Sequence, residues 1–217
     1  MIRHTLLTCL LFITLITPAY SRQVRPAPSA TKQKPALPYV TRAGNTSLRL
    51  AIGADSAIVD LKNDIQGCVG KLYDSFSTMK VVGKAIPKIK VLDRVAKDNN
   101  YYVVVLTTAT SNCNIQGQCG AADDLTLIWL KLDSHLKLEG KKAIAIEQCR
   151  AFLHLVEPKL DYDGYGNNSI KLSQGKLKIK FADEMDFDGS KHTLSELIYD
   201  RSIPENGFIV ITQKKNK

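Results

Sequence analysis

Hydrophobic and polar residues alternate along much of the chain after Pro87, which is the pattern of half-buried β-strands. Residues 88–96 alternate in part, and residues 101–110 are rich in the aromatic and β-branched side chains that strands favour. The polar stretch Lys97–Asn100 between them is typical of a turn, so the two segments predict a β-hairpin. The same reasoning predicts further strands at residues 48–52, 125–132, 136–147, 152–156, 170–172, 177–181, 194–199 and 208–212.

The segment 125–132 predicts a strand at the centre of a sheet. Leu127 and Trp129 lie on one of its sides, and Ile128 and Leu130 lie on the other. Because both sides are largely apolar, other parts of the protein must cover both of them. Short turns connect the successive strands, so neighbouring strands are expected to pair antiparallel.

A different period precedes these strands. Between residues 56 and 79, apolar side chains recur in steps of three and four, which places them on one face of a helix. These residues are Ile58, Leu61, Ile65, Cys68, Leu72 and Phe76. Asp55 or Ser56 is a suitable N-cap, whereas Gly67 and Gly70 each weaken a helix by about 1 kcal/mol. The spacing predicts a helix over residues 56–79 that turns Cys68 toward the core.

The predicted fold is mostly β, of the α+β type. It is an antiparallel sheet, curved or folded into a sandwich or partial barrel, with one N-terminal helix packed on it. We expect a signal peptide at residues 1–21, a proline-rich linker at 22–46, one globular domain at 47–213 and a basic tail at 214–217. The linker has too few large apolar residues to offset the entropy of ordering it.

The first 21 residues have the three zones of a cleaved secretory signal. Arg3 and His4 form a basic start, Thr5–Thr17 is mostly apolar, and small residues precede a cut after Ser21, or alternatively after Ala19. The apolar run is shorter than the roughly 20 residues that a membrane span needs. We therefore expect a soluble, secreted or periplasmic protein rather than an integral membrane protein.

The net charge of +9 belongs to the two ends of the chain. Residues 1–42 hold six basic residues and no acid, and residues 213–217 hold three lysines and no acid. The 21 acidic residues all lie between them, balanced by 21 basic ones. A nucleic-acid-binding domain is expected to have a basic surface of its own, so we expect no nucleic-acid partner.

Export also decides how the cysteines are interpreted. Four remain after the signal, and an even number in an oxidising compartment indicates disulfides. Three pairings are compatible with the sequence. We favour Cys113–Cys119, which a tight turn would close, together with the long-range pair Cys68–Cys149. No Cys-x-x-Cys or zinc-type Cys/His spacing occurs, so a redox or zinc site is not expected.

Common catalytic motifs are missing from the sequence. It has no Gly-x-Ser-x-Gly, no His-Glu-x-x-His and no phosphate-binding loop. His135 and His192 lie in expected loops, and His154 lies in an apolar run; a solvated or packed role is favoured for each. Because a triad can assemble from distant residues, a hydrolase using His154 or His192 stays open as an alternative.

Two acidic loops are the best candidates for binding. Residues 161–168 and 183–189 each offer three or four of the six to eight oxygen ligands that calcium takes, although the turn preference of Asp, Asn and Gly explains both loops as well. In the first loop, exposed tyrosine rings could stack on a sugar or a peptide. The candidate binding residues are Asp161, Tyr162, Asp163 and Tyr165.

Together these features predict an exported, non-enzymatic β-rich domain that binds a protein, a glycan or an envelope component. A secreted hydrolase with an unrecognised site and a purely structural or assembly protein are the alternatives. No catalytic residue, metal or cofactor is expected.

Overall fold

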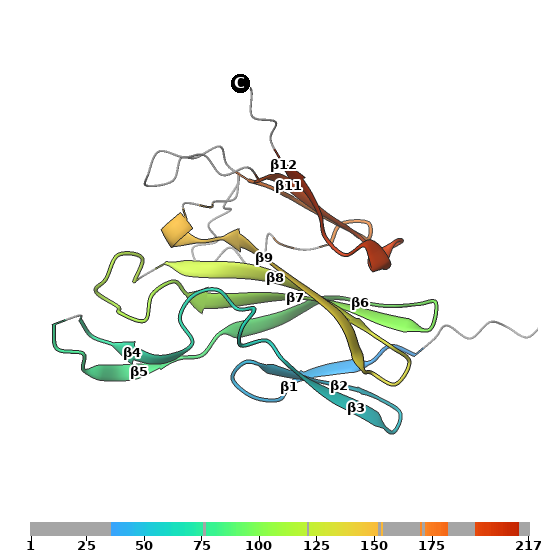
Figure 1. The fold of residues 1–217 in the computed structure, drawn as a ribbon, viewed down its shortest axis with the longest axis horizontal. Helices are drawn as coiled ribbons and strands as arrows, with labels where there is room; N and C mark the ends of the chain where they lie inside the picture. The colour runs from blue at the N-terminus through green and yellow to red at the C-terminus, as the bar shows by residue number, and fades with distance from the viewer. Residues whose placement is uncertain are drawn as a thin grey trace, which may run out of the picture. The chain divides into compact units, whose positions relative to one another are not determined.

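β-Strands dominate the part of the chain that this computed structural model describes (Figure 1). That part comprises residues 36–75, 77–120, 122–151, 153, 170, 172–181 and 194–212. It belongs to one compact unit, Pro35–Lys217, and the other unit, Met1–Lys34, lies outside it. Within the described residues the helices are two short 3₁₀ turns, and none is long and apolar enough to cross a membrane. The predicted mostly-β, antiparallel class is confirmed.

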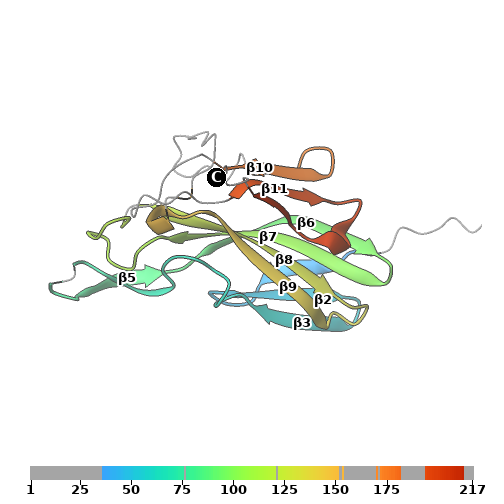
Figure 2. The same cartoon turned by 45° about the horizontal axis from the view of Figure 1, so that its top comes forward.

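The strands form four antiparallel sheets (Figures 1 and 2). The largest has the order β6 (Lys88–Lys97), β7 (Asn100–Thr110), β8 (Asp123–Leu132) and β9 (Leu138–Glu147). A three-stranded sheet contains β1 (Tyr39–Arg42), β2 (Ser47–Ile52) and β3 (Asp55–Asp60). Another contains β10 (Lys176–Lys180), β11 (Leu194–Asp200) and β12 (Ile209–Thr212). The fourth is the hairpin of β4 (Gly70–Tyr73) and β5 (Val81–Ala85). The 3₁₀ turns are η1 (Cys149–Ala151) and η3 (Pro204–Asn206).

The four-stranded sheet packs against a three-stranded sheet on each face, which gives three layers. One core cluster joins it to the β10–β12 sheet, and it includes Val104, Leu127, Trp129, Leu177, Leu197 and Tyr199. The other joins it to the β1–β3 sheet, and it includes Leu48, Leu50, Val103, Ile128 and Leu130. Successive residues of β7 and β8 alternate between the two clusters, as side chains of a strand must. The prediction of a central strand at residues 125–132 is confirmed.

The predicted hairpin of residues 88–110 is also confirmed. β6 and β7 pair antiparallel and are joined at Asp98 and Asn99, which have positive φ angles of 50° and 60°. Asp and Asn tolerate this left-handed region better than most residues, and the tight primed turns of hairpins require it. The predicted pairing of residues 194–199 with 208–212 is present as β11 and β12.

The predicted helix over residues 56–79 is wrong. The segment instead contains β3, a loop and β4. Gly67 and Gly70 have φ angles of 89° and 125°, a backbone region incompatible with a right-handed helix. A Cβ on Gly67 would lie 2.7 Å from the carbonyl oxygen of Thr110. Leu61, Ile65 and Cys68 are buried from loop positions, so the apolar spacing reflects burial without a helix.

The predicted disulfide pairing is wrong as well. The bonds are Cys68–Cys113 and Cys119–Cys149, in place of Cys113–Cys119 and Cys68–Cys149. The cysteine loop, residues 111–120, is held at both ends instead of being closed on itself. One bond ties it to the segment before β4, and the other ties it to η1, the turn that follows β9.

The first strand, β1, begins before Ser47, where we placed the start of the domain. β1 lies inside the range assigned to the linker and pairs with β2 from Tyr39 opposite Ala51 to Arg42 opposite Leu48. Val40 packs against the core between the two sheets. Four residues thus gain a partner strand although the sequence around them is rich in proline. Of the strand expected at residues 152–156, Leu153 alone is described, and it bridges Gln148.

Candidate functional site

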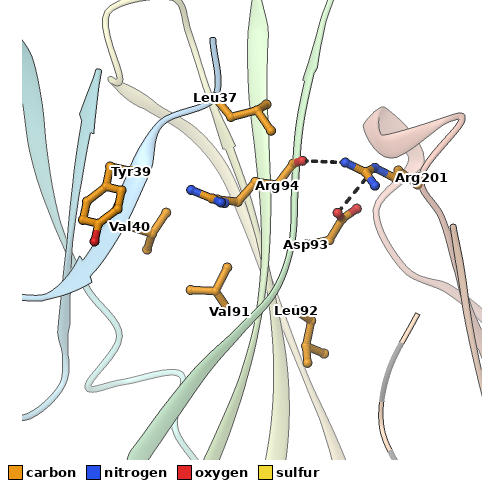
Figure 3. A pocket seen from close by; sticks show the side chains of 8 residues that line it. All are labelled: Leu37, Tyr39, Val40, Val91, Leu92, Asp93, Arg94 and Arg201. Carbon is orange, nitrogen blue, oxygen red and sulfur yellow. Dashed lines mark hydrogen bonds and ion pairs between the residues drawn. The ribbon is translucent and has the colours of Figure 1, made fainter. Parts of the chain in front are cut away.

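A cleft of about 390 Å³ opens beside β6, the edge strand of the four-stranded sheet. The start of β1 lies on one side of it, and the turn after β11 lies on the other (Figure 3). Its lining combines apolar side chains with three charged ones. These residues are Leu37, Tyr39, Val40, Val91, Leu92, Asp93, Arg94 and Arg201.

A β-bulge in β6 places the charged residues of the cleft. Val91 pairs with Val105 and Asp93 pairs with Val104, so Leu92 is an extra residue in the strand. Beyond the bulge, Asp93 lies on the face of the β10–β12 sheet, where it meets Tyr199. Arg94 lies on the opposite face, where it reaches the segment before β1. Two neighbouring residues therefore contact the two outer layers.

Asp93 is buried, and its carboxylate has two partners. The Tyr199 hydroxyl donates a hydrogen bond to Oδ2 over 3.0 Å, and the Arg201 Nε lies 3.4 Å from Oδ1. Arg201 also donates from Nη2 to the carbonyl oxygen of Arg94 over 3.2 Å (Figure 3). Burial raises the pKa of Tyr199, and the charge of Asp93 raises it further, so the hydroxyl stays protonated as a donor. The negative charge of Asp93 is thus compensated within the protein.

Arg94 has unused hydrogen-bonding capacity and, unlike Arg201, is not paired with a carboxylate among the described residues. Among the described residues its side chain has a single hydrogen-bond partner, the carbonyl oxygen of Pro38, to which Nη1 donates over 2.9 Å. A guanidinium has five N–H donors, so most of them are left for another acceptor. Leu37 and Val40 lie beside it in the cleft (Figure 3). A guanidinium with free donors is suited to hold a carboxylate through paired hydrogen bonds.

The aromatic ring of Tyr39 completes this side of the cleft. Its side chain is 68% exposed. Tyr combines a broad apolar face with a polar hydroxyl, and is therefore common where a surface becomes covered by a partner. The cleft thus has a positive group, an exposed aromatic ring and an aliphatic floor at Val91 and Leu92.

Of the binding and catalytic candidates from the sequence, the structure describes only His135. Asp161, Tyr162, Asp163 and Tyr165 lie outside the described residues, as do the 183–189 loop, His154 and His192. His135 is exposed, with Nδ1 3.6 Å from Oδ2 of Asp55, which is exposed as well. In the described part of the chain, no group of three or more His, Cys, Asp or Glu residues is placed to hold a metal ion.

Sequence reasoning missed the cleft because its residues come from three distant segments. One signal was nevertheless present. Two apolar residues in succession, Val91 and Leu92, break the alternation of the strand, and an acid and a base follow directly at its edge. A doubled apolar position in an alternating strand is what a bulge produces, and bulges often redirect a side chain next to a functional site.

Comparisons with protein-family models, with curated proteins and with solved structures find no match for this chain.

Proposed function

We propose that this protein is an exported, non-enzymatic binding domain whose β6 cleft holds a carboxylate joined to an apolar group. Acidic protein segments and acidic envelope components both carry this combination. The observation that carries the proposal is the Arg94 guanidinium, which uses one donor on Pro38 and lines a cleft that it shares with Leu37, Val40 and Leu92. A charge-assisted pair with a carboxylate would use the remaining donors.

The balance of charge in the cleft favours an anion. Asp93 is paired with Arg201 and accepts a hydrogen bond from Tyr199, so it does not neutralise Arg94. An apolar chain attached to the anion would bind more tightly, because it would be buried against Leu37, Val40 and Leu92.

The edge of β6 is a poor template for adding a strand from a partner. A bulge interrupts it, and Arg94 at this edge reaches across to Pro38. Bulges and charged side chains are the usual means by which edge strands avoid pairing with other chains. The cleft is therefore better suited to a ligand bound through its carboxylate and apolar group than to a peptide whose backbone pairs with β6.

Export and a non-enzymatic role rest on independent observations. Two disulfides within the chain are typical of extracellular or periplasmic proteins, and the first 21 residues resemble a signal peptide. The four cysteines of the described residues are all used in these bonds. His135, the histidine that the structure describes, is exposed on a turn away from the residues that line the cleft.

Binding of simple carboxylates tests the proposed function. Acetate, butyrate, hexanoate and octanoate are titrated into the exported protein, and the amide resonances are followed by NMR. Affinity should rise with chain length, because burying a CH₂ group contributes about 0.8 kcal/mol. Hexanamide, which keeps the chain and removes the charge, should bind more weakly than hexanoate. Equal binding of hexanamide and hexanoate would reject a site built on Arg94.

A further inference from the structure

The β4–β5 hairpin forms a second surface with a distinct character. We use the name basic finger for residues 70–75 and 77–86, which comprise the hairpin, the described part of its turn and Ile86. The finger pairs within itself, β4 with β5, and belongs to neither three-stranded sheet. Figures 1 and 2 both show β5 at the end of the four-stranded sheet that carries the cysteine loop.

The base of the finger is firmly attached to the core. The Cys68–Cys113 disulfide joins the residues before β4 to the cysteine loop, and the amide of Cys68 donates to the carbonyl oxygen of Thr110 over 2.6 Å. Tyr73 continues the attachment: its amide donates to the carbonyl oxygen of Cys113, and its own carbonyl accepts from the amide of Ile115. The finger is therefore presented in a fixed position.

Asp74 organises the turn at the tip of the finger. Its Oδ1 accepts hydrogen bonds from the backbone amides of Ser75 and Lys80 over 2.7 and 3.1 Å, and from the hydroxyl of Thr78. The Thr78 hydrogen bond holds the pKa of Asp74 below its ordinary value. This carboxylate is therefore committed to the turn and leaves the lysines of the finger without an acidic partner.

Three exposed lysines give the finger its positive charge. Lys71 on β4 and Lys84 on β5 are direct partners in the hairpin register, and Lys80 lies at the end of the turn. None of the three forms an ion pair with any residue that the structure describes. Like charges directly opposite one another weaken a strand pair. An anionic partner would remove that repulsion.

Large apolar side chains lie exposed among these lysines. Met79, Val81, Val82 and Ile86 are each about half exposed, at 54, 49, 49 and 51%. A register shift between Leu72 and Tyr73 makes Val82 an extra residue, which places two consecutive valines in solvent. Apolar side chains interleaved with lysines are the composition of surfaces that lie in the interface of an anionic membrane.

We propose that the basic finger docks this protein on the surface of an anionic lipid bilayer. Lysines near such a surface are attracted to its negative potential, and their long stems let the charge stay at the headgroups while neighbouring apolar groups enter. The residues that line the β6 cleft lie at β1, β6 and the turn after β11, so the finger is a surface separate from that cleft. The finger is a projecting hairpin. Such a shape can enter a deformable lipid surface more easily than a protein groove of fixed shape.

Vesicle co-sedimentation tests this proposal with the full exported chain. The vesicles contain phosphatidylglycerol and phosphatidylcholine in equal amounts, or phosphatidylcholine alone. The charge variant is Lys71→Gln/Lys84→Gln, and the apolar variant is Val81→Ser/Val82→Ser. The matched control, Lys62→Gln/Lys137→Gln, removes the same charge from exposed sites outside the finger. All variants keep the basic tails, so differences among them report on the finger.

The proposal predicts binding to the anionic vesicles alone. The charge variant should lose roughly tenfold or more in affinity, given the attraction of a lysine near an anionic surface. The apolar variant should lose several-fold, whereas the control and a Lys71→Arg/Lys84→Arg variant should bind like the wild type. Binding should also fall in about 1 M salt, where the Debye length is only about 3 Å and the attraction between lysines and anionic headgroups is screened. Equal losses in the control and the charge variant, no loss in the apolar variant, or no binding to anionic vesicles would overturn the proposal.

Discussion

The hydroxyl of Tyr199 in β11 donates a hydrogen bond to Oδ2 of Asp93 in β6, 3.0 Å away and in a different sheet. Both side chains are buried, Tyr199 completely. A buried carboxylate requires such partners, because water cannot replace them. This bond, with the Arg201 ion pair at the other oxygen, fixes the edge of β6 against the β10–β12 sheet and sets the position of Arg94 next to it.

Removing the Tyr199 hydroxyl should destabilise the protein. Tyr199→Phe keeps the ring in the core and leaves Oδ2 of Asp93 buried without its donor, which costs about 1–3 kcal/mol. Urea denaturation should show a lower midpoint at an unchanged slope. Tyr39→Phe removes an exposed hydroxyl and is the matched control, with a change within about 0.5 kcal/mol. Similar effects of the two substitutions would show that the buried bond contributes nothing.

The disulfide bonds give a direct chemical prediction. Peptide mapping of the non-reduced protein should recover Cys68 linked to Cys113, and Cys119 linked to Cys149. The double variant Cys68→Ala/Cys113→Ala should lose about 2–4 kcal/mol of stability, because the unfolded chain is no longer constrained. A peptide containing Cys113 linked to Cys119 would contradict the arrangement of the cysteine loop.

Acid should remove a contribution to stability that depends on Asp200. Hydrogen bonds from the Ser202 hydroxyl and amide, together with Lys176, lower the pKa of Asp200 to about 2. A carboxyl whose pKa is lower in the folded state stabilises the fold above its unfolded pKa of about 3.9, and this contribution is lost as the pH falls toward 2. Carboxyl-carbon NMR should show the low pKa, and Ser202→Ala should raise it and move acid unfolding to higher pH. An ordinary pKa in both proteins would contradict these contacts.

Two deletions separate the contribution of β1 to stability from that of the residues before it. Removing residues 22–46 eliminates β1, the contact of Val40 with the core and the Pro38 acceptor of Arg94. The thermal midpoint should then fall by at least 5 °C, which corresponds to roughly 1–2 kcal/mol for a domain of this size. Removing residues 22–35 alone should leave the midpoint nearly unchanged, since that stretch is proline-rich and poor in large apolar residues. Equal midpoints for the two deletions would show that β1 adds no stability.

The strands were predictable where local chemistry and burial agree. Residues 125–132 are apolar on both sides, and β8 is covered by a layer on each face. The turn at Asp98 and Asn99 contains residues that accept positive φ, and a hairpin follows from it. In these segments the periodicity, the turn residues and the final packing all favour the same structure.

The spacing of apolar residues gave a wrong prediction where those residues are buried for a reason other than a helix. Leu61, Ile65 and Cys68 are spaced like one face of a helix, but they enter the core from a loop whose glycines have positive φ. The disulfide pairing was wrong because closeness along the chain says nothing about which segments the sheets bring together. The cleft could not be assembled for the same reason: Pro38, Arg94 and Arg201 meet only after three layers have packed.

The binding of octanoate by Arg94 variants tests the central claim most directly. Saturable octanoate binding, with amide shifts at residues 37, 39, 40 and 91–94, is predicted for the wild type and for the matched control Arg49→Gln, which changes an exposed arginine of β2. Arg94→Gln should weaken binding by at least about tenfold, because a hydrogen bond to a charged group contributes about 1.5–3 kcal/mol. Octanoate binding that is equal in Arg94→Gln and the wild type would contradict the proposed site.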